Sequence, residues 1–144
     1  MVFPFLANDR YIKLWRLNED DDSNTYVNED FQYKIHLYGI NQIKWNSEGN
    51  LLASAGNDCS LNVVDVNSQS INRNFKLESC VTCLDFNYAS NLILLGTYDN
   101  QIVLFDMRCK NLISHLLAHS EPITSVSFSP DSTVLMSTSY DGFW

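Results

Sequence analysis

A motif that recurs every 41 or 42 residues constrains the fold of this chain more than any other feature. Aspartates that follow short apolar runs occur at three such positions, Asp58, Asp99 and Asp141. Two hydrophobic registers repeat with the same spacing: Ile43, Leu84 and Val126, and Trp45, Phe86 and Phe128. Three registers that share one period indicate an internal repeat. A period near 40 residues is typical of propeller-type blades, which contain four short strands each.

The stretch 91–106, NLILLGTYDNQIVLFD, shows what one repeat encodes locally. Two short apolar runs flank the polar turn Tyr98-Asp99-Asn100. Runs of this length bounded by Gly, Asn and Asp predict buried strands joined as a hairpin, because those residues tolerate turn geometry. The sequence shows no sustained helical periodicity. We therefore expect an all-β fold built from blades of four antiparallel strands.

The period divides the chain into two whole repeats flanked by partial ones. We expect residues 5–38 to hold the end of one repeat, 39–78 and 79–119 to be repeats, and 120–144 to be a truncated repeat. Since one unit cannot bury both faces of its sheet, the units must stack on one another. Closed rings typically have about 4–8 blades, so about three units predict a single open, incomplete propeller and a chain that is a fragment.

Acidic residues dominate the charge of the chain, which is −8 overall. This balance argues against direct binding to the phosphate backbone of nucleic acids. The run Glu19-Asp20-Asp21-Asp22 lies within residues 18–30, which we expect to form a solvated acidic loop; a docking site for a basic partner is the alternative. The first residues lack the features of a signal peptide, and no apolar run approaches the length of a membrane span. The nucleus, or alternatively the cytoplasm, is the expected location.

Several segments at repeat-specific positions resemble the WD-repeat family. They are Trp15, Val64-Asp65 and Phe105-Asp106 at the position of the Trp-Asp dipeptide, Ala118-His119 where the family has Gly-His, and 126–131 (VSFSPD) as an inner strand and its exit. The resemblance implies the blades of a WD-repeat β-propeller. It also implies a non-catalytic scaffold that binds other proteins, with no cofactor, no small-molecule substrate and no membrane partner.

The resemblance further implies a buried hydrogen-bond network that joins a loop histidine, a strand hydroxyl, the turn aspartate and a tryptophan. The matching residues are His36 and His119, Ser54, Ser137 and Ser139, Asp58, Asp99 and Asp141, and Trp15. Such a network is structural, because polar groups buried where strands meet must be hydrogen-bonded. A catalytic Ser-His-Asp site is the alternative. The repetition argues against it, since an active site is normally one asymmetric place.

The cysteines and one further histidine invite a metal or redox interpretation. Cys80-x-x-Cys83 has ligand-like spacing, but no second pair follows at the spacing of a zinc site. We therefore expect Cys59, Cys80, Cys83 and Cys109 to be buried or partly exposed free thiols in a reducing compartment, with no metal bound. His115 lies in an apolar strand, and we expect a packed or edge histidine rather than a ligand.

Members of the family bind partners mainly at the end of the propeller where loops enter the innermost strands and hairpin turns lie beside them. In this sequence the inner strands begin near Asn41, Thr82 and Thr124, and the turn residues before each aspartate are Asn57, Tyr98 and Tyr140. These six residues form the predicted partner-binding face. An exposed tyrosine suits an interface, because it offers a large rigid surface together with a hydroxyl.

Within the family, four segments resemble the WD-repeat core subunit of COMPASS-type (MLL-type) histone lysine methyltransferase complexes. They are 86–87, 90–93, 117–122 and 139–142. The resemblance implies a nuclear scaffold whose pocket holds an arginine of a histone tail or of the methyltransferase subunit between aromatic rings. Thr82 replaces such a ring, Asn57 replaces an acid and Asn41 replaces a serine. The alternatives are a WD-repeat scaffold of another assembly, in RNA processing or as a ubiquitin ligase substrate receptor, and a truncated product without function.

Overall fold

The chain folds into antiparallel strands, and the described residues contain no helix. The computed structural model describes residues 2–5, 10–19, 25–109 and 111–144. Their strands are β1 (Val2–Phe5), β2 (Tyr11–Glu19), β3 (Thr25–Lys34), β4 (Ile40–Trp45), β5 (Leu51–Gly56), β6 (Ser60–Asp65), β7 (Ser70–Lys76), β8 (Val81–Phe86), β9 (Leu92–Thr97), β10 (Gln101–Asp106), β11 (Asn111–Leu117), β12 (Ile123–Phe128) and β13 (Leu135–Ser139). Within these ranges no helix is long and apolar enough to cross a membrane.

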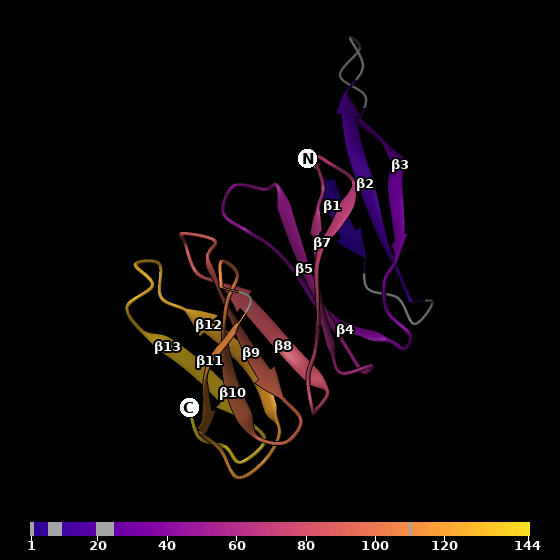
Figure 1. The fold of residues 1–144 in the computed structure, drawn as a ribbon. Coiled ribbons are helices and arrows are strands. Elements are labelled where there is room, and N and C mark those ends of the chain that lie inside the picture. The colour runs from indigo at the N-terminus through magenta and orange to yellow at the C-terminus, as the bar shows by residue number, and fades with distance from the viewer. Residues whose placement is uncertain (1, 6–9, 20–24, 110) are drawn as a thin grey trace.

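The strands form four separate sheets in chain order, as Figure 1 shows. The first sheet has the order β1-β2-β3, the next two are β4-β5-β6-β7 and β8-β9-β10-β11, and the last is the pair β12-β13. All pairings are antiparallel, and each four-stranded sheet follows the chain from one edge to the other. The all-β class and the four-stranded antiparallel blades are therefore confirmed. The row of sheets is open, because the N-terminal sheet and the β12-β13 pair lie at its two ends (Figure 1).

Alternating side chains of the central strands pack against different neighbours. In β5, Leu52 belongs to a cluster with Ile12 and Leu14 of the first sheet, whereas Ala53 belongs to the cluster between the two four-stranded sheets. In β9, Leu94 joins a cluster with Ile123 and other residues of β12. Both faces of these strands are buried, so their sequences are mostly apolar rather than alternating between apolar and polar residues. Stacking of neighbouring sheets therefore supplies the core.

The inner strands of three sheets are β4, β8 and β12, and the turn that follows each of them is closed in the same way. The side-chain oxygen of Asn46 accepts hydrogen bonds from the amides of Asn50 and Leu51, at 3.1 and 2.9 Å. The side chain of Asn87 accepts the corresponding bonds in the next sheet, and the hydroxyl of Ser129 accepts one in the last. Because Asn and Ser side chains can replace a missing backbone partner, these residues fix the turns between β4 and β5 and their equivalents.

The predicted acidic loop at residues 18–30 is mostly strand. Strand β2 continues to Glu19 and β3 begins at Thr25, with Asn18 opposite Tyr26 in the register. Antiparallel pairing needs only backbone groups, so it can continue after the apolar pattern that predicts a strand has ended. Strand β3 continues to Lys34. Most of the acidic run, residues 20–22, falls outside the described residues.

Candidate interaction face and its hydrogen-bond networks

A bulge occurs at the same place in each of the three inner strands. The pairing shifts between Ile40 and Gln42, between Val81 and Cys83, and between Ile123 and Ser125. The residues in the bulges are Asn41, Thr82 and Thr124. A bulge leaves one residue out of the ladder and can redirect its side chain. Three of the predicted face residues therefore occupy equivalent backbone positions.

The hairpin turns that carry the other face residues lie beside the starts of the inner strands. The amide of Asn57 donates to the carbonyl of Gly39 at 2.9 Å, and the amide of Tyr98 donates to that of Cys80 at 2.9 Å. In the last sheet the amide of Tyr140 donates to the carbonyl of Pro122 at 3.3 Å. These repeated bonds place all six predicted face residues at one end of their sheets. At this end Tyr98 and Tyr140 are 66% and 78% exposed.

Two of the face residues also bind the neighbouring sheet. The amide group of Asn41 donates to the carbonyl of Val81 at 2.7 Å and to the side-chain oxygen of Asn57 at 2.8 Å. The hydroxyl of Thr82 donates to the carbonyl of Ile123 at 2.6 Å. Asn41 and Thr82 are thus half-buried and joined to the next inner strand, whereas Asn57 and Thr124 are exposed.

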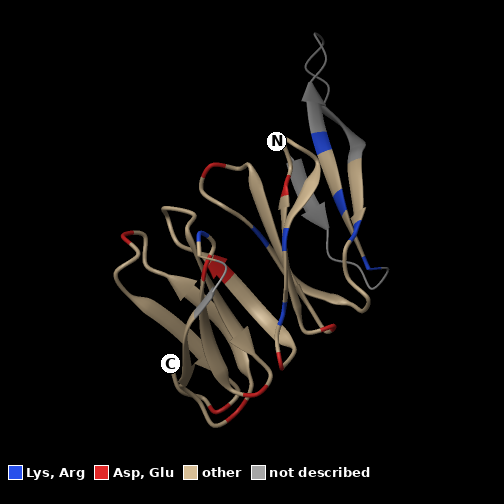
Figure 2. Ribbon diagram, in the orientation of Figure 1, with Lys and Arg blue, Asp and Glu red and all other residues tan. Residues whose placement is uncertain are grey.

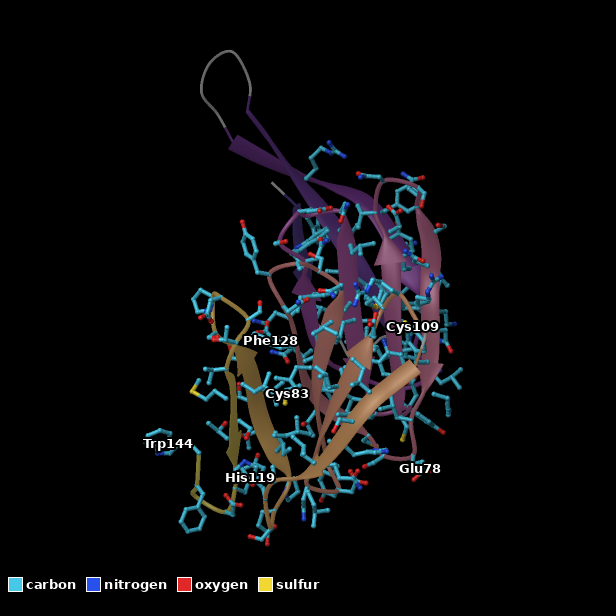
Figure 3. All side chains as sticks on the ribbon, turned by 60° about the vertical axis from the view of Figure 1, so that its left-hand side comes forward. Glu78, Cys83, Cys109, His119, Phe128 and Trp144 are labelled. Atoms are coloured by element: carbon cyan, nitrogen blue, oxygen red, sulfur yellow. The ribbon has the colours of Figure 1, made fainter. Side chains whose placement is uncertain are left out.

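Acidic side chains lie at the same end of the sheets as the tyrosines. Figure 2 shows acidic residues along the loops at the lower end of the second and third sheets, and Figure 3 shows Glu78 and His119 at that same end. Glu78, Asp99 and Glu121 are exposed there. Exposed carboxylates attract cationic groups, so this end of the molecule is suited to a basic segment of a partner.

The first histidine network is buried beneath the Asn57 turn. Nδ1 of His36 lies 3.0 Å from a carboxylate oxygen of Asp58, and Nε2 lies 2.8 Å from the hydroxyl of Ser54. Since a carboxylate only accepts, Nδ1 of His36 donates to Asp58, and Nε2 shares the second hydrogen bond with the Ser54 hydroxyl. The amide of Leu37 and the hydroxyl of Ser60 also donate to Asp58, at 2.8 and 2.6 Å.

These contacts determine the ionisation of Asp58. Burial favours the neutral acid, but the hydrogen bonds from Ser60, His36 and the Leu37 amide together outweigh it and hold the pKa of Asp58 below its ordinary value. Asp58 is therefore a carboxylate at neutral pH. A buried carboxylate whose donors are all internal has no exposed substrate position, which supports a structural role.

Sequence reasoning missed three members of this network, which are Ser60, Asn62 and Asn74. The amide nitrogen of Asn62, which is fully buried, lies 3.3 Å from Nε2 of His36 and donates to the Ile35 carbonyl and the Ser60 hydroxyl. Asn74 of β7 donates to the side-chain oxygen of Asn62. The available signal was the alternation in β6, where Ser60 and Asn62 fall on one face between apolar residues.

The last sheet repeats the network with fewer members. Nδ1 of His119 lies 2.9 Å from Asp141, Nε2 lies 2.8 Å from the Ser137 hydroxyl, and the amide of Ser120 donates to Asp141 at 3.0 Å. Burial acts to raise the pKa of Asp141. Hydrogen bonds from the amides of Phe143 and Ser120 and from the His119 ring together outweigh burial, so this pKa lies below its ordinary value. Ser139, also considered for this role, instead donates to the carbonyls of Glu121 and Pro122.

The middle sheet replaces three members of the set by apolar residues. At a spacing of 41 residues, Leu77, Leu95 and Val103 stand where the first set has His36, Ser54 and Asn62. The remaining acid, Asp99, is exposed and accepts hydrogen bonds from Thr97 and Gln101. A cavity of about 460 Å³ opens at this place between β7 and the sheet β8–β11, with Leu77, Asp99 and Val103 in its lining.

Trp15, Asp99 and His115 do not join a histidine network. Trp15 is a half-buried residue of β2, opposite Phe3 and Glu29 in the register. Asp99 has the contacts described above, and His115 is an exposed residue of β11, the last strand of its sheet, which agrees with an edge position.

The cysteines are free in this structure. Cys83 is buried, Cys59 and Cys80 are partly exposed, and Cys109 is exposed. Burial raises the pKa of the Cys83 thiol, although hydrogen bonds from Thr82, Gly96 and Val126 oppose this. In the described part of the chain, no three His, Cys, Asp or Glu side chains gather closely enough to hold a metal ion.

Comparison with known families identifies the class of protein. Residues 6–89 match the anaphase-promoting complex subunit 4 WD40 domain, and residues 110–144 match the WD domain, G-beta repeat. The first match covers more than half of the chain and the sheets have the expected construction. The chain therefore belongs to the WD-repeat family, whose domains serve as protein-interaction scaffolds.

Individual relatives come from several assemblies. The chain is 27% identical over 132 residues to the COMPASS component SWD3 of Saccharomyces cerevisiae, covering 91% of this chain and 40% of that protein. It is 27% identical over 110 residues to the U3 small nucleolar RNA-associated protein 21 of the same yeast, covering 76% of this chain and 12% of the relative. It is 29% identical over 140 residues to the U5 small nuclear ribonucleoprotein 40 kDa protein of Dictyostelium discoideum, covering 94% of this chain and 37% of that protein. The chain thus spans less than half the length of each of these relatives.

Proposed function

We propose that this protein is a non-catalytic WD-repeat subunit of a COMPASS-type histone lysine methyltransferase complex and binds a basic protein segment at the end that carries Tyr98 and Tyr140. The observation that carries the proposal is that these two exposed tyrosines lie at the same end of the sheets as the exposed acids Glu78, Asp99 and Glu121. The similarity to a COMPASS component over 91% of the chain supports the choice of assembly. The proposed location is the nucleus.

The chemistry of this end suits an arginine or lysine side chain. An aromatic face attracts a cation, and a nearby carboxylate adds a charge-assisted hydrogen bond. Tyr98 and Tyr140 supply the aromatic groups, while Glu78, Asp99 and Glu121 supply charge. These acids offset the loss of the acidic residue that Asn57 replaces in related pockets.

The proposed face spans successive repeats. We place the repeats at 39–78 and 79–119, with the next beginning at 120, so that each contributes one bulge residue and one turn residue. The bonds from Asn41 to Val81 and from Thr82 to Ile123 hold these contributions in register. Partner affinity should therefore depend on the junctions between sheets as well as on the exposed tyrosines.

A second candidate is a scaffold of an RNA-processing assembly. It is favoured by the similarity to a U3 small nucleolar RNA-associated protein and to a U5 small nuclear ribonucleoprotein. The net charge of −8 argues that such a role would run through protein partners rather than through direct contact with RNA. The two candidates predict different co-purifying proteins.

Affinity purification of the tagged full-length protein from nuclei, with partners identified by mass spectrometry, tests the proposal. We expect methyltransferase subunits with the wild type and at least tenfold less of them with Y98A/Y140A. Y88A is the matched control, because Tyr88 is also exposed, at 76%, but lies on the turn at the opposite end of its sheet. Recovery of RNA-processing proteins would favour the second candidate. Equal recovery with Y98A/Y140A would show that this face is not the binding site.

A further inference from the structure

Two cysteines from neighbouring sheets lie in contact beneath the predicted face. The sulfur atoms of Cys59 and Cys80 are 3.5 Å apart. Cys59 belongs to the turn between β5 and β6, and Cys80 immediately precedes β8 of the next sheet. The thiol of Cys80 also donates to the carbonyl of Asn57 at 3.3 Å. The sequence drew attention to Cys80-x-x-Cys83, but the contact joins residues 21 positions apart.

We propose that Cys59 and Cys80 form a site of reversible covalent modification, at which a hydroperoxide oxidises the two thiols to a disulfide that joins the two four-stranded sheets. Both residues are partly exposed, and a small oxidant such as hydrogen peroxide needs little space to approach them. Backbone bonds hold both residues in place: the Leu77 amide donates to the Cys59 carbonyl at 2.8 Å, and the Tyr98 amide donates to the Cys80 carbonyl at 2.9 Å.

The reaction balances with hydrogen peroxide as the oxidant. The sulfur of one thiolate attacks a peroxide oxygen, the O–O bond breaks, and hydroxide leaves and takes up a proton as water. The resulting sulfenic acid is attacked by the second sulfur, the S–O bond breaks, and a second water leaves as the S–S bond forms. Two thiols lose two electrons, and one peroxide is reduced to two waters. A dithiol reductant reverses the change by thiol–disulfide exchange.

The groups around Cys59 influence how readily its thiol is oxidised. Burial and the contact with Cys80 raise the pKa of the Cys59 thiol, while the Lys76 ammonium opposes the rise and the Asp58 carboxylate adds to it. A thiol with a raised pKa is mostly protonated at neutral pH and reacts slowly. Proximity of the second sulfur is therefore the main feature that favours the disulfide over further oxidation.

The modification would change the face as well as the junction. Once oxidised, Cys80 has no S–H, so the carbonyl of Asn57 loses this donor. The bond would also fix the turn 57–59 covalently to the start of β8, whereas in the reduced protein the Cys80 thiol meets this turn through its hydrogen bond to the Asn57 carbonyl and its contact with Cys59. This inference does not depend on which assembly the protein joins.

Thiol counting on the purified 144-residue chain tests the inference. After treatment with hydrogen peroxide and denaturation, maleimide mass labelling should find two of the four thiols, and dithiothreitol should restore all four. Trypsin cleaves after Arg73 and Lys76, so Cys59 and Cys80 fall in different peptides that only a disulfide can join. The second peptide also contains Cys83, and fragment ions must therefore assign the link to Cys80.

Single substitutions provide the matched controls. C83S should keep the link and C109S should also keep it, whereas C59S and C80S should abolish it. The denaturation midpoint should rise on oxidation of the wild type and stay unchanged in C80S, whose fold is checked by circular dichroism. A link to Cys83 or Cys109, or free thiols at both Cys59 and Cys80 at a peroxide concentration that oxidises the exposed Cys109, would overturn the inference. Figure 3 shows Cys83 and Cys109 at separate places in the fold.

Discussion

His36 illustrates how a single buried polar residue determines what its neighbours can be. The residue is 2% exposed, and both ring nitrogens have partners in Asp58 and Ser54. In the next repeat the equivalent positions hold Leu77 and Leu95. A partly satisfied buried network is less stable than an apolar core of similar shape, so such residues are expected to change together. The two sheets represent two consistent solutions of the same packing problem.

Replacing His36 alone should therefore be costly. H36L leaves Asp58 and Ser54 without a main partner, and we expect the free energy of unfolding to fall by about 2–3 kcal/mol. H119L should cost less, because its partners Ser137 and Asp141 are half-buried, whereas Ser54 and Asp58 are buried. Urea unfolding followed by circular dichroism measures both. A smaller loss for H36L than for H119L would show that the buried network is not a main source of stability.

Asp58 should make stability depend on pH in acid. Its pKa is lowered in the folded state, so the unfolded state binds a proton more readily as the pH falls. The contribution is fully present above the unfolded pKa, about 4, and is lost as the pH falls through the folded value. We expect D58N to be less stable at pH 7 and to lose less stability on acidification. Asp106, Asp131 and Asp141 also have lowered pKa values, so the difference between wild type and D58N isolates Asp58. Parallel curves would contradict this role.

At the scale of strands, the sequence predicts well where apolar runs are short and bounded by turn formers. The hairpin around Tyr98-Asp99-Asn100 forms as expected, with β9 and β10 on either side. The prediction failed at residues 18–30, because β2 and β3 pair through backbone groups beyond the apolar pattern. Pairing of that kind leaves no mark in the order of side chains.

The candidate site was predictable only in part, for a similar reason. The repeat spacing brings out His36, Asp58 and the turn tyrosines, since each recurs at a fixed position. Asn62 and the Cys59–Cys80 contact depend on which side chains of neighbouring strands and sheets meet, and a linear pattern does not contain that information. Contacts between sheets therefore had to come from the structure.

Gly96 marks a close approach between β9 and its neighbours. A Cβ atom there would lie 2.5 Å from the sulfur of Cys83 and 2.6 Å from Cγ2 of Ile123. G96A should therefore overpack the junction with β12 and cost about 1–3 kcal/mol. G49N is the control, since Gly49 has a φ of +71°, which asparagine tolerates, and nothing lies near its Cβ position. Urea unfolding gives the free energies of unfolding of G96A and G49N. Equal values for the two variants would show that the junction between β9 and β12 is loosely packed.

The sheets are coupled through contacts that recur from one inner strand to the next. Figure 1 shows the sheets in a row, and β8 packs beside β4 and β12. Asp85 of β8 accepts from the Phe128 amide at 2.9 Å on one side and lies 3.6 Å from the Lys44 ammonium on the other. In a repeat architecture, stability is roughly a sum over units and the interfaces between neighbours. The partner face can keep its shape only if these interfaces hold the sheets as one body.

Equilibrium unfolding in urea, followed by far-ultraviolet circular dichroism and by tryptophan fluorescence, tests most directly whether the sheets form one frame. The first signal reports all sheets, whereas the second reports the surroundings of Trp15 in β2, Trp45 in β4 and Trp144 after β13. The two transitions should coincide in the wild type. D85A should lose about 1–2 kcal/mol and separate the transitions, while K44A, which removes only a half-exposed ion pair, should stay within about 0.5 kcal/mol of the wild type. Separate transitions in the wild type would contradict a single cooperative frame and, with it, a face shared between repeats.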